Sequence, residues 1–119
     1  MNNEKILLLR KKWSDSLNSQ NIAGIMECYD DNAIFKGTMN GRFTANREDI
    51  RNYFESMISK KATVRFIGNP KIKQFDKAYI EYGEYEFCVN NQTLYAKYSF
   101  TYILNKRPYI ISHVSYKNR

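Results

Sequence analysis

The spacing of apolar residues in the first sixty positions predicts three helices. In the first, over residues 4–19, an apolar stripe recurs every three or four residues: Ile6, Leu9, Trp13 and Leu17. A short second helix follows the candidate N-cap Asn21, and its apolar face consists of Ile22, Ile25, Met26 and Tyr29. A third helix follows the candidate N-cap Asn46, with helical spacing among Ile50, Tyr53, Phe54, Met57 and Ile58.

Asp30-Asp31-Asn32 should end the second helix, because these side chains favour local backbone bonds over helix continuation. A short strand is predicted over 33–36 and a turn over 37–41. From Ala62 onward the apolar period changes to two, which predicts four strands at about 63–74, 77–88, 93–104 and 108–116.

Short polar segments separate these strands, as hairpin turns would: Asp76-Lys77, Asn90-Asn91-Gln92 and Asn105-Lys106-Arg107. Pro70 should kink the first long strand. Helices followed by a strand meander indicate an α+β fold with an antiparallel sheet. No linker or repeat interrupts the chain, so we expect one domain over 1–119.

Alternation along the strands sorts their side chains into two faces. One set is mostly apolar, and we expect the helices to pack on it: Ala78, Ile80, Tyr82, Glu84; Leu94, Ala96, Tyr98, Phe100, Tyr102, Leu104; Ile110, Ser112, Val114, Tyr116. The other set is rich in rings and mixed in polarity: Tyr79, Glu81, Gly83, Tyr85, Phe87; Tyr95, Lys97, Ser99, Thr101, Ile103; Tyr109, Ile111, His113, Ser115. An exposed aromatic face of this kind is a candidate homodimer surface.

Composition changes this picture little. Of 119 residues, 43% are apolar and 26% are charged, which excludes global disorder. Aromatic residues make up 15%, and the formal net charge is +7. The basic residues are scattered and match no nucleic-acid motif, so we expect a solvated basic surface rather than nucleic-acid binding.

Cys28 and Cys88 have no CxxC partner, and His113 is the sole histidine, so we expect two buried free thiols and no metal site. The apolar run at 6–9 is too short for a signal sequence or membrane span, which favours a cytoplasmic protein.

Several stretches together resemble the cone-shaped nuclear transport factor 2 fold. They begin at Trp13 and run through 29–38 and 42–54. Further matches are Gly83-Glu84-Tyr85-Glu86-Phe87, Lys97-Tyr98-Ser99-Phe100-Thr101-Tyr102 and Tyr109-Ile110-Ile111-Ser112-His113. Within that superfamily, also called cystatin-like, the chain is most similar to the association (hub) domain of calcium/calmodulin-dependent protein kinase II and its free-standing bacterial relatives.

The resemblance implies a curved antiparallel sheet wrapped around the N-terminal helices, with a pocket at the open end of the cone. It also implies dimers, or larger rings, formed through the outer face of the sheet. Kinase hubs place three arginines in that pocket, at positions that correspond here to Glu84, Phe100 and Tyr116, so a pocket of the kinase-hub kind for anions is not expected. The arginine of the bacterial relatives is Lys97 here, which keeps the charge but loses the planar fork.

The resemblance and the face assignment together predict two groups of functional residues. The predicted ligand pocket comprises Trp13, Arg42, Tyr53, Tyr82, Glu84, Tyr98, Phe100 and Tyr116. The predicted dimer interface comprises Tyr85, Phe87, Lys97, Ser99, Thr101 and His113. Glu84 is the most interesting of these, because a carboxylate on an apolar face lined by tyrosines must either pair or shift its pKa.

The favoured function is a non-catalytic homo-oligomerising module with a small-molecule pocket and no cofactor. The alternative is a small isomerase, dehydratase or cyclase of the same fold, acting on a hydrophobic carbonyl or ring substrate. Isomerases of this fold use an aspartate base shortly after the second helix, and that position is Gly37 here. Asp30 and Asp31 are expected to serve the turn rather than proton transfer.

Overall fold

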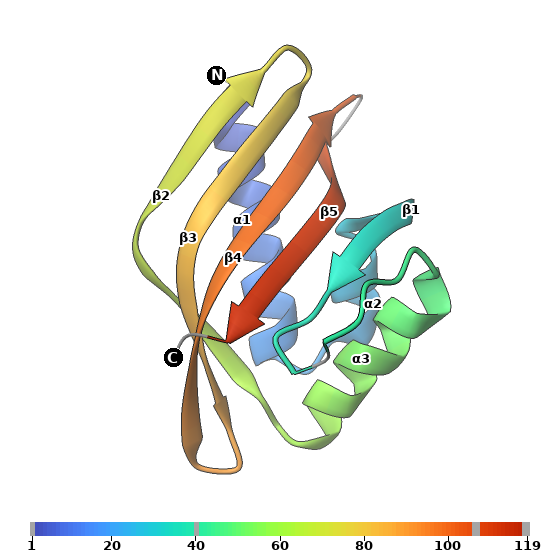
Figure 1. Cartoon of the computed structure of the whole chain (residues 1–119), viewed down its shortest axis with the longest axis vertical. Helices are drawn as coiled ribbons and strands as arrows, with labels where there is room; N and C mark the ends of the chain where they lie inside the picture. The colour runs from blue at the N-terminus through green and yellow to red at the C-terminus, as the bar shows by residue number, and fades with distance from the viewer. Residues whose placement is uncertain (1, 40, 106–107, 118–119) are drawn as a thin grey trace.

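A computed structural model (Figure 1) describes residues 2–39, 41–105 and 108–117. Its elements are α1 (Asn2–Asn18), α2 (Ile22–Met26), β1 (Tyr29–Lys36), α3 (Arg47–Ser59), β2 (Thr63–Phe75), β3 (Ala78–Val89), β4 (Gln92–Leu104) and β5 (Pro108–Lys117). The predicted α+β class and helix–helix–strand–helix–meander order are confirmed. One boundary was wrong, because Tyr29 begins β1 instead of ending the second helix. Lys106 and Arg107 of the last predicted turn lie outside the described residues.

The five strands form one sheet in the order β1-β5-β4-β3-β2. The four C-terminal strands pair antiparallel, as predicted, whereas β1 runs parallel to β5 and places Phe35 opposite His113. Figure 1 shows the sheet curving across α1, with α2 and α3 gathered beside β1. The helices therefore cover one face of the sheet, and the opposite face, which we call the outer face, is left without a layer.

Both predicted N-caps are present. The side-chain oxygen of Asn21 accepts from the Gly24 N–H at 3.0 Å. That of Asn46 accepts from the N–H groups of Glu48 and Asp49 at 2.8 and 3.3 Å. These bonds satisfy donors that the first helical turn leaves without partners, so the two helices begin where the sequence indicates.

The turn between β3 and β4 contains two residues, not three. Asn90 and Asn91 have φ values of 52° and 64°, and Val89 therefore pairs with Gln92. A two-residue turn with positive φ at both positions matches the twist of a hairpin, and asparagine tolerates that conformation better than most residues. In β2 the predicted kink at Pro70 is confirmed by a register shift between Ile67 and Lys71, where Gly68 has φ +75°.

The face assignment made from alternation is correct for β4 but wrong for β3 and for most of β5. The two-residue turn places Glu81 opposite Phe100 and Tyr85 opposite Ala96, so the odd-numbered residues of β3 face the helices. In β5 a register shift after Ile110 reverses the alternation, and His113 faces inward opposite Phe100. A one-residue change of register moves every side chain of a strand to the other face, which explains both errors.

Candidate functional site

The outer face carries most of the large apolar side chains that remain exposed on the sheet. Tyr82, Tyr95 and Tyr116 are 43%, 51% and 53% exposed, and Ile34, Ile67 and Phe75 lie exposed on the same face. A shallow hollow of about 220 Å³ lies among Lys97, Tyr98, Ser99, Val114 and Tyr116. A sheet face that carries several exposed large apolar side chains is a candidate interaction surface.

The predicted interface residues divide between the two faces. Lys97, Ser99 and Thr101 lie on the outer face, as expected: Lys97 pairs with Glu84 and Tyr116, and Thr101 pairs with Ile80 and Ser112. Tyr85, Phe87 and His113 are instead buried against the helices, so their assignment to the interface was wrong.

The two cysteines differ in exposure. Cys28 is buried, as expected, whereas Cys88, which was also expected to be buried, is exposed.

The predicted pocket residues do not meet in one place. Tyr82, Glu84 and Tyr116 are exposed on the outer face, which corrects their assignment to the interior. Trp13 of α1 is buried against the sheet together with Tyr98 and Phe100 of β4, and the Trp13 and Phe100 rings lie 5.2 Å apart in an edge contact. Arg42 and Tyr53 line a separate pocket beside α3.

The carboxylate enclosed by tyrosines is Glu81, not Glu84. Glu81 is completely buried, and its Oε2 accepts from Arg10 Nε at 2.7 Å and from the Tyr98 hydroxyl. Its Oε1 accepts from the Tyr102 hydroxyl at 2.7 Å. Burial raises the pKa of Tyr102 well above its usual value, and the negative charge of Glu81 raises it further. This phenol therefore stays protonated and acts as a donor.

Arg10 reaches Glu81 from α1, with its guanidinium 3.6 Å from the centre of the Phe66 ring. Neither Arg10 nor Glu81 was among the predicted site residues. Arg10 was counted with the scattered basic residues of a solvated surface, and alternation with a three-residue turn put Glu81 on the wrong face. The signal that could have found the pair was the Asn90-Asn91 turn, because its length determines which residues of β3 face inward.

His113 is the centre of a second buried group. Its Nδ1 lies 2.8 Å from the Tyr29 hydroxyl and its Nε2 lies 2.9 Å from the Tyr85 hydroxyl. Trp13 Nε1 donates to the Tyr29 hydroxyl at 3.0 Å. Burial lowers the pKa of His113 to about 3, so the ring is neutral at pH 7 and acts as one donor and one acceptor between the two phenols.

Gly37, the position of the isomerase base, is buried against Tyr53. A Cβ atom at this residue would overlap the Tyr53 ring. The same ring packs against Phe35, with centroids 5.0 Å apart, and the Tyr53 hydroxyl accepts from the Met39 N–H at 3.3 Å. A carboxylate at position 37 would therefore require Tyr53 to move, and the chain uses this space for packing.

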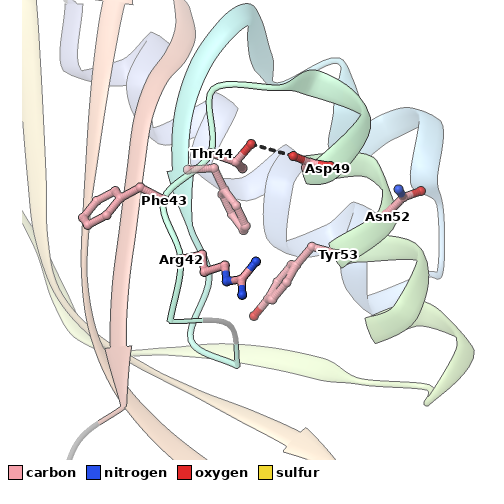
Figure 2. Close-up of a pocket in the computed structure, with 7 residues that line it drawn as sticks. Arg42, Phe43, Thr44, Asp49, Asn52 and Tyr53 are labelled. Carbon is pink, nitrogen blue, oxygen red and sulfur yellow. Dashed lines mark hydrogen bonds between the residues drawn. The ribbon is translucent and has the colours of Figure 1, made fainter.

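A pocket of about 500 Å³ lies between α3 and the loop that precedes it, and we call it the α3 pocket (Figure 2). Seven residues line it: Phe35, Arg42, Phe43, Thr44, Asp49, Asn52 and Tyr53. Thr44 Oγ1 donates to Asp49 Oδ2 at 2.8 Å at one end. Figure 2 shows Arg42 and Tyr53 approaching each other at the other end, while Phe43 points away from the helix.

Among the residues that the structure describes, no three His, Cys, Asp or Glu side chains lie close enough together to hold a metal ion. Within the same residues, none of the helices combines the length and apolar character that crossing a membrane requires.

Comparison with known proteins identifies the family. The sequence model of the calcium/calmodulin dependent protein kinase II association domain matches residues 2–111. No curated protein matches the chain. Among solved structures, a candidate association domain of this kind from Xanthomonas campestris is 24% identical, with a TM-score of 0.84, covering 95% of this chain and 85% of that one.

Two further structures show how widely the fold is used. A nuclear transport factor 2-like protein of unknown function from Shewanella oneidensis is 15% identical, with a TM-score of 0.82, over 98% of this chain and 99% of that one. A candidate ketosteroid isomerase from Parabacteroides distasonis is 16% identical, with a TM-score of 0.75, over 96% and 86%. At these identities the likeness shows the cystatin-like, nuclear transport factor 2-like fold and not the activity.

Proposed function

This chain belongs to the calcium/calmodulin dependent protein kinase II association domain family, and from that premise we propose that it is a homo-oligomerising module whose copies pair through the outer face of the sheet. The observation that carries the proposal is the exposure of Tyr82, Tyr95 and Tyr116 on a face that no helix covers. Tyrosine supplies large contact area with few rotatable bonds, and aromatic residues are enriched in interfaces.

The centre of this face suits close contact between two sheets. Ser99 and Thr101 are small and half-buried, and they lie between the half-buried Ile80 and Val114 on the neighbouring strands. Lys97 lies opposite Glu84, and Arg65 lies opposite Glu86, so this face carries both acidic and basic groups. Two copies related by a two-fold axis could therefore match apolar centres and set unlike charges against each other at the rim.

An enzyme of the same fold is less well supported. Glu81, the inward-facing carboxylate of β3, is completely buried with both oxygens bonded, so a substrate does not reach it. Trp13 packs against the rings of Tyr85 and Phe100 in the same core. The geometry thus favours association over catalysis.

Light scattering at micromolar concentration tests the proposal. The wild-type chain should have at least twice the mass of one copy, and Thr101→Glu should reduce it to one, because the substitution would bury a carboxylate in the interface on each copy. Ser56→Glu, on the exposed surface of α3, is the matched control and should leave the assembly intact. A monomeric wild type, or an unchanged mass in Thr101→Glu, would contradict pairing through this face.

A further inference from the structure

One exposed ring on the outer face is held in place by a buried lysine. The Lys36 ammonium lies 4.1 Å from the centre of the Tyr116 ring and donates to the Ser115 carbonyl at 2.9 Å. Lys36 is only 8% exposed, whereas Tyr116 is 53% exposed. A cation over an aromatic face is attracted by the charge distribution of the ring, and this attraction is stronger when the cation is desolvated. Tyr116 is therefore an exposed side chain whose ring has a fixed support.

The burial of Lys36 makes the contact with Tyr116 important to the fold. Among the residues that the structure describes, none of the ion pairs involves Lys36. A buried charge is costly unless other groups compensate it, and here the Ser115 carbonyl and the Tyr116 ring do so. If the ring turned away, the ammonium would keep only the carbonyl, so the observed position of Tyr116 is favoured over its alternatives.

The other two exposed tyrosines of the outer face are held less firmly. Lys71 Nζ lies 6.0 Å from the centre of the Tyr82 ring, at the outer limit for an attraction of this kind. Tyr95 is 51% exposed, and within the described ranges no lysine or arginine lies over its ring. A side chain that is fixed before binding loses less conformational entropy on association. Tyr116 is therefore the tyrosine of this face that is best prepared to anchor a contact.

The shallow hollow beside Tyr116 has room for a ring. Its volume is about 220 Å³, and its lining includes Lys97, Ser99 and Val114. Ser99 and Val114 lie opposite each other in the β4–β5 ladder, and both are half-buried. An apolar cavity of about 150 Å³ is already large enough to hold a benzene ring. The outer face thus carries a supported ring and, next to it, a space of the size that a ring needs.

A ring next to a hollow is an arrangement that a two-fold interface can use twice. In such an interface the same patch of both copies meets, so each contact from one copy to the other is repeated in reverse. We propose that Tyr116 of each copy enters the hollow of its partner, against Ser99 and Val114, and that Lys36 is the positioning residue for this anchor. The anchor rests on the proposed pairing of copies through the outer face.

Sedimentation velocity over a dilution series gives the Kd of self-association and tests the anchor. Tyr116→Ala should raise this Kd by about tenfold or more, as truncation of a central interface tyrosine does. Tyr116→Phe keeps the ring and should stay within about threefold of wild type. The control Tyr95→Ala removes a ring of similar exposure from the same face and should also stay within about threefold, because few residues carry most of the binding energy of an interface.

A double-mutant cycle tests the role of Lys36. Lys36→Met keeps an unbranched side chain and removes the ammonium. It should raise the Kd by about fivefold when Tyr116 is present and by less than about twofold in the Tyr116→Ala background. The control Lys73→Met removes the same charge on β2, three strands away from β5, and should have the same effect in both backgrounds. A merely structural role of Lys36 would weaken association equally with and without Tyr116.

Tyr116→Leu gives a second measurement if Lys36→Met does not fold. It keeps apolar area at an exposed position but offers the ammonium no ring, and it should raise the Kd by about fivefold. Equal Kd values for Tyr116→Ala and Tyr95→Ala, equal effects of Lys36→Met in both backgrounds, or a wild-type Kd in Tyr116→Leu would overturn the anchor and leave pairing through the outer face in place. A monomeric wild-type chain would contradict the pairing itself, and the anchor with it.

Discussion

Glu81 lies directly opposite Phe100 in the β3–β4 ladder, and this pairing carries a carboxylate into the core beneath α1. There it joins Arg10 of α1 to the hydroxyls of Tyr98 and Tyr102. The helix and the sheet are thus linked by a buried ion pair as well as by apolar contact. Such a pair is costly to break, because removing one partner leaves the other charge buried and without compensation.

Glu81→Ala should therefore lower the free energy of unfolding by about 3 kcal/mol, a typical value for breaking a buried pair. Glu84→Ala, three residues along the same strand and exposed on the outer face, should change it by less than about 0.5 kcal/mol. Urea denaturation followed by circular dichroism measures both. A larger effect at Glu84 than at Glu81 would mean that the register of β3 is misassigned.

The buried His113 should make stability fall in mild acid. Its pKa is about 3 in the folded protein against an ordinary value of 6.5, so the unfolded chain binds the extra proton first. The free energy of unfolding is then fully retained above pH 6.5 and falls by about 1.4 kcal/mol per pH unit as the pH drops toward 3.

Comparing urea midpoints at pH 7 and pH 5 tests this expectation, because most carboxylates remain ionised in that interval. The variant His113→Gln keeps a donor and an acceptor between Tyr29 and Tyr85 but does not titrate. It should be less stable than wild type at pH 7 and should lose much less stability between the two pH values. An equal loss in both proteins would assign the acid sensitivity to another group.

Gly37→Ala should destabilise the fold by about 1–3 kcal/mol, the usual range for overpacking, since its Cβ would overlap the Tyr53 ring. Gly41→Ala is a control in the same loop, where an added Cβ meets no heavy atom within 4 Å. Thermal unfolding distinguishes the two. Similar melting temperatures for both variants would show that Tyr53 can move aside without cost.

The Asn90-Asn91 turn offers a test of the register itself. Asn91→Gly should stabilise the chain or leave it unchanged, because glycine adopts positive φ freely, whereas Asn91→Val should cost about 1–2 kcal/mol. Asn105, which ends the described part of the β4–β5 connection, has no positive φ, and Asn105→Val should have little effect. Equal tolerance of valine at both positions would argue against a two-residue turn between β3 and β4.

The helices and strands, and the order in which they follow one another, could be predicted from the sequence alone. Apolar periods of 3.6 and two located the helices and strands, and the asparagine caps located two helix starts, because these signals depend only on neighbouring residues. The family resemblance, which rests on short motifs in order along the chain, was also readable from the sequence, and the family match over residues 2–111 confirms it.

Which side of each strand faces the helices depends on how the strands pair, and local alternation does not reveal that pairing. Alternation placed Glu84 and Tyr82 on the same face of β3, and that grouping is confirmed. Whether this face points toward the helices depends on whether the turn between β3 and β4 has two residues or three. The register shift after Ile110 in β5 has the same effect on His113. Both strands carry rings on each face, so hydrophobicity alone did not show which set of alternate residues points inward. Pairing with β4 settled which tyrosines enclose a carboxylate and which remain exposed on the outer face.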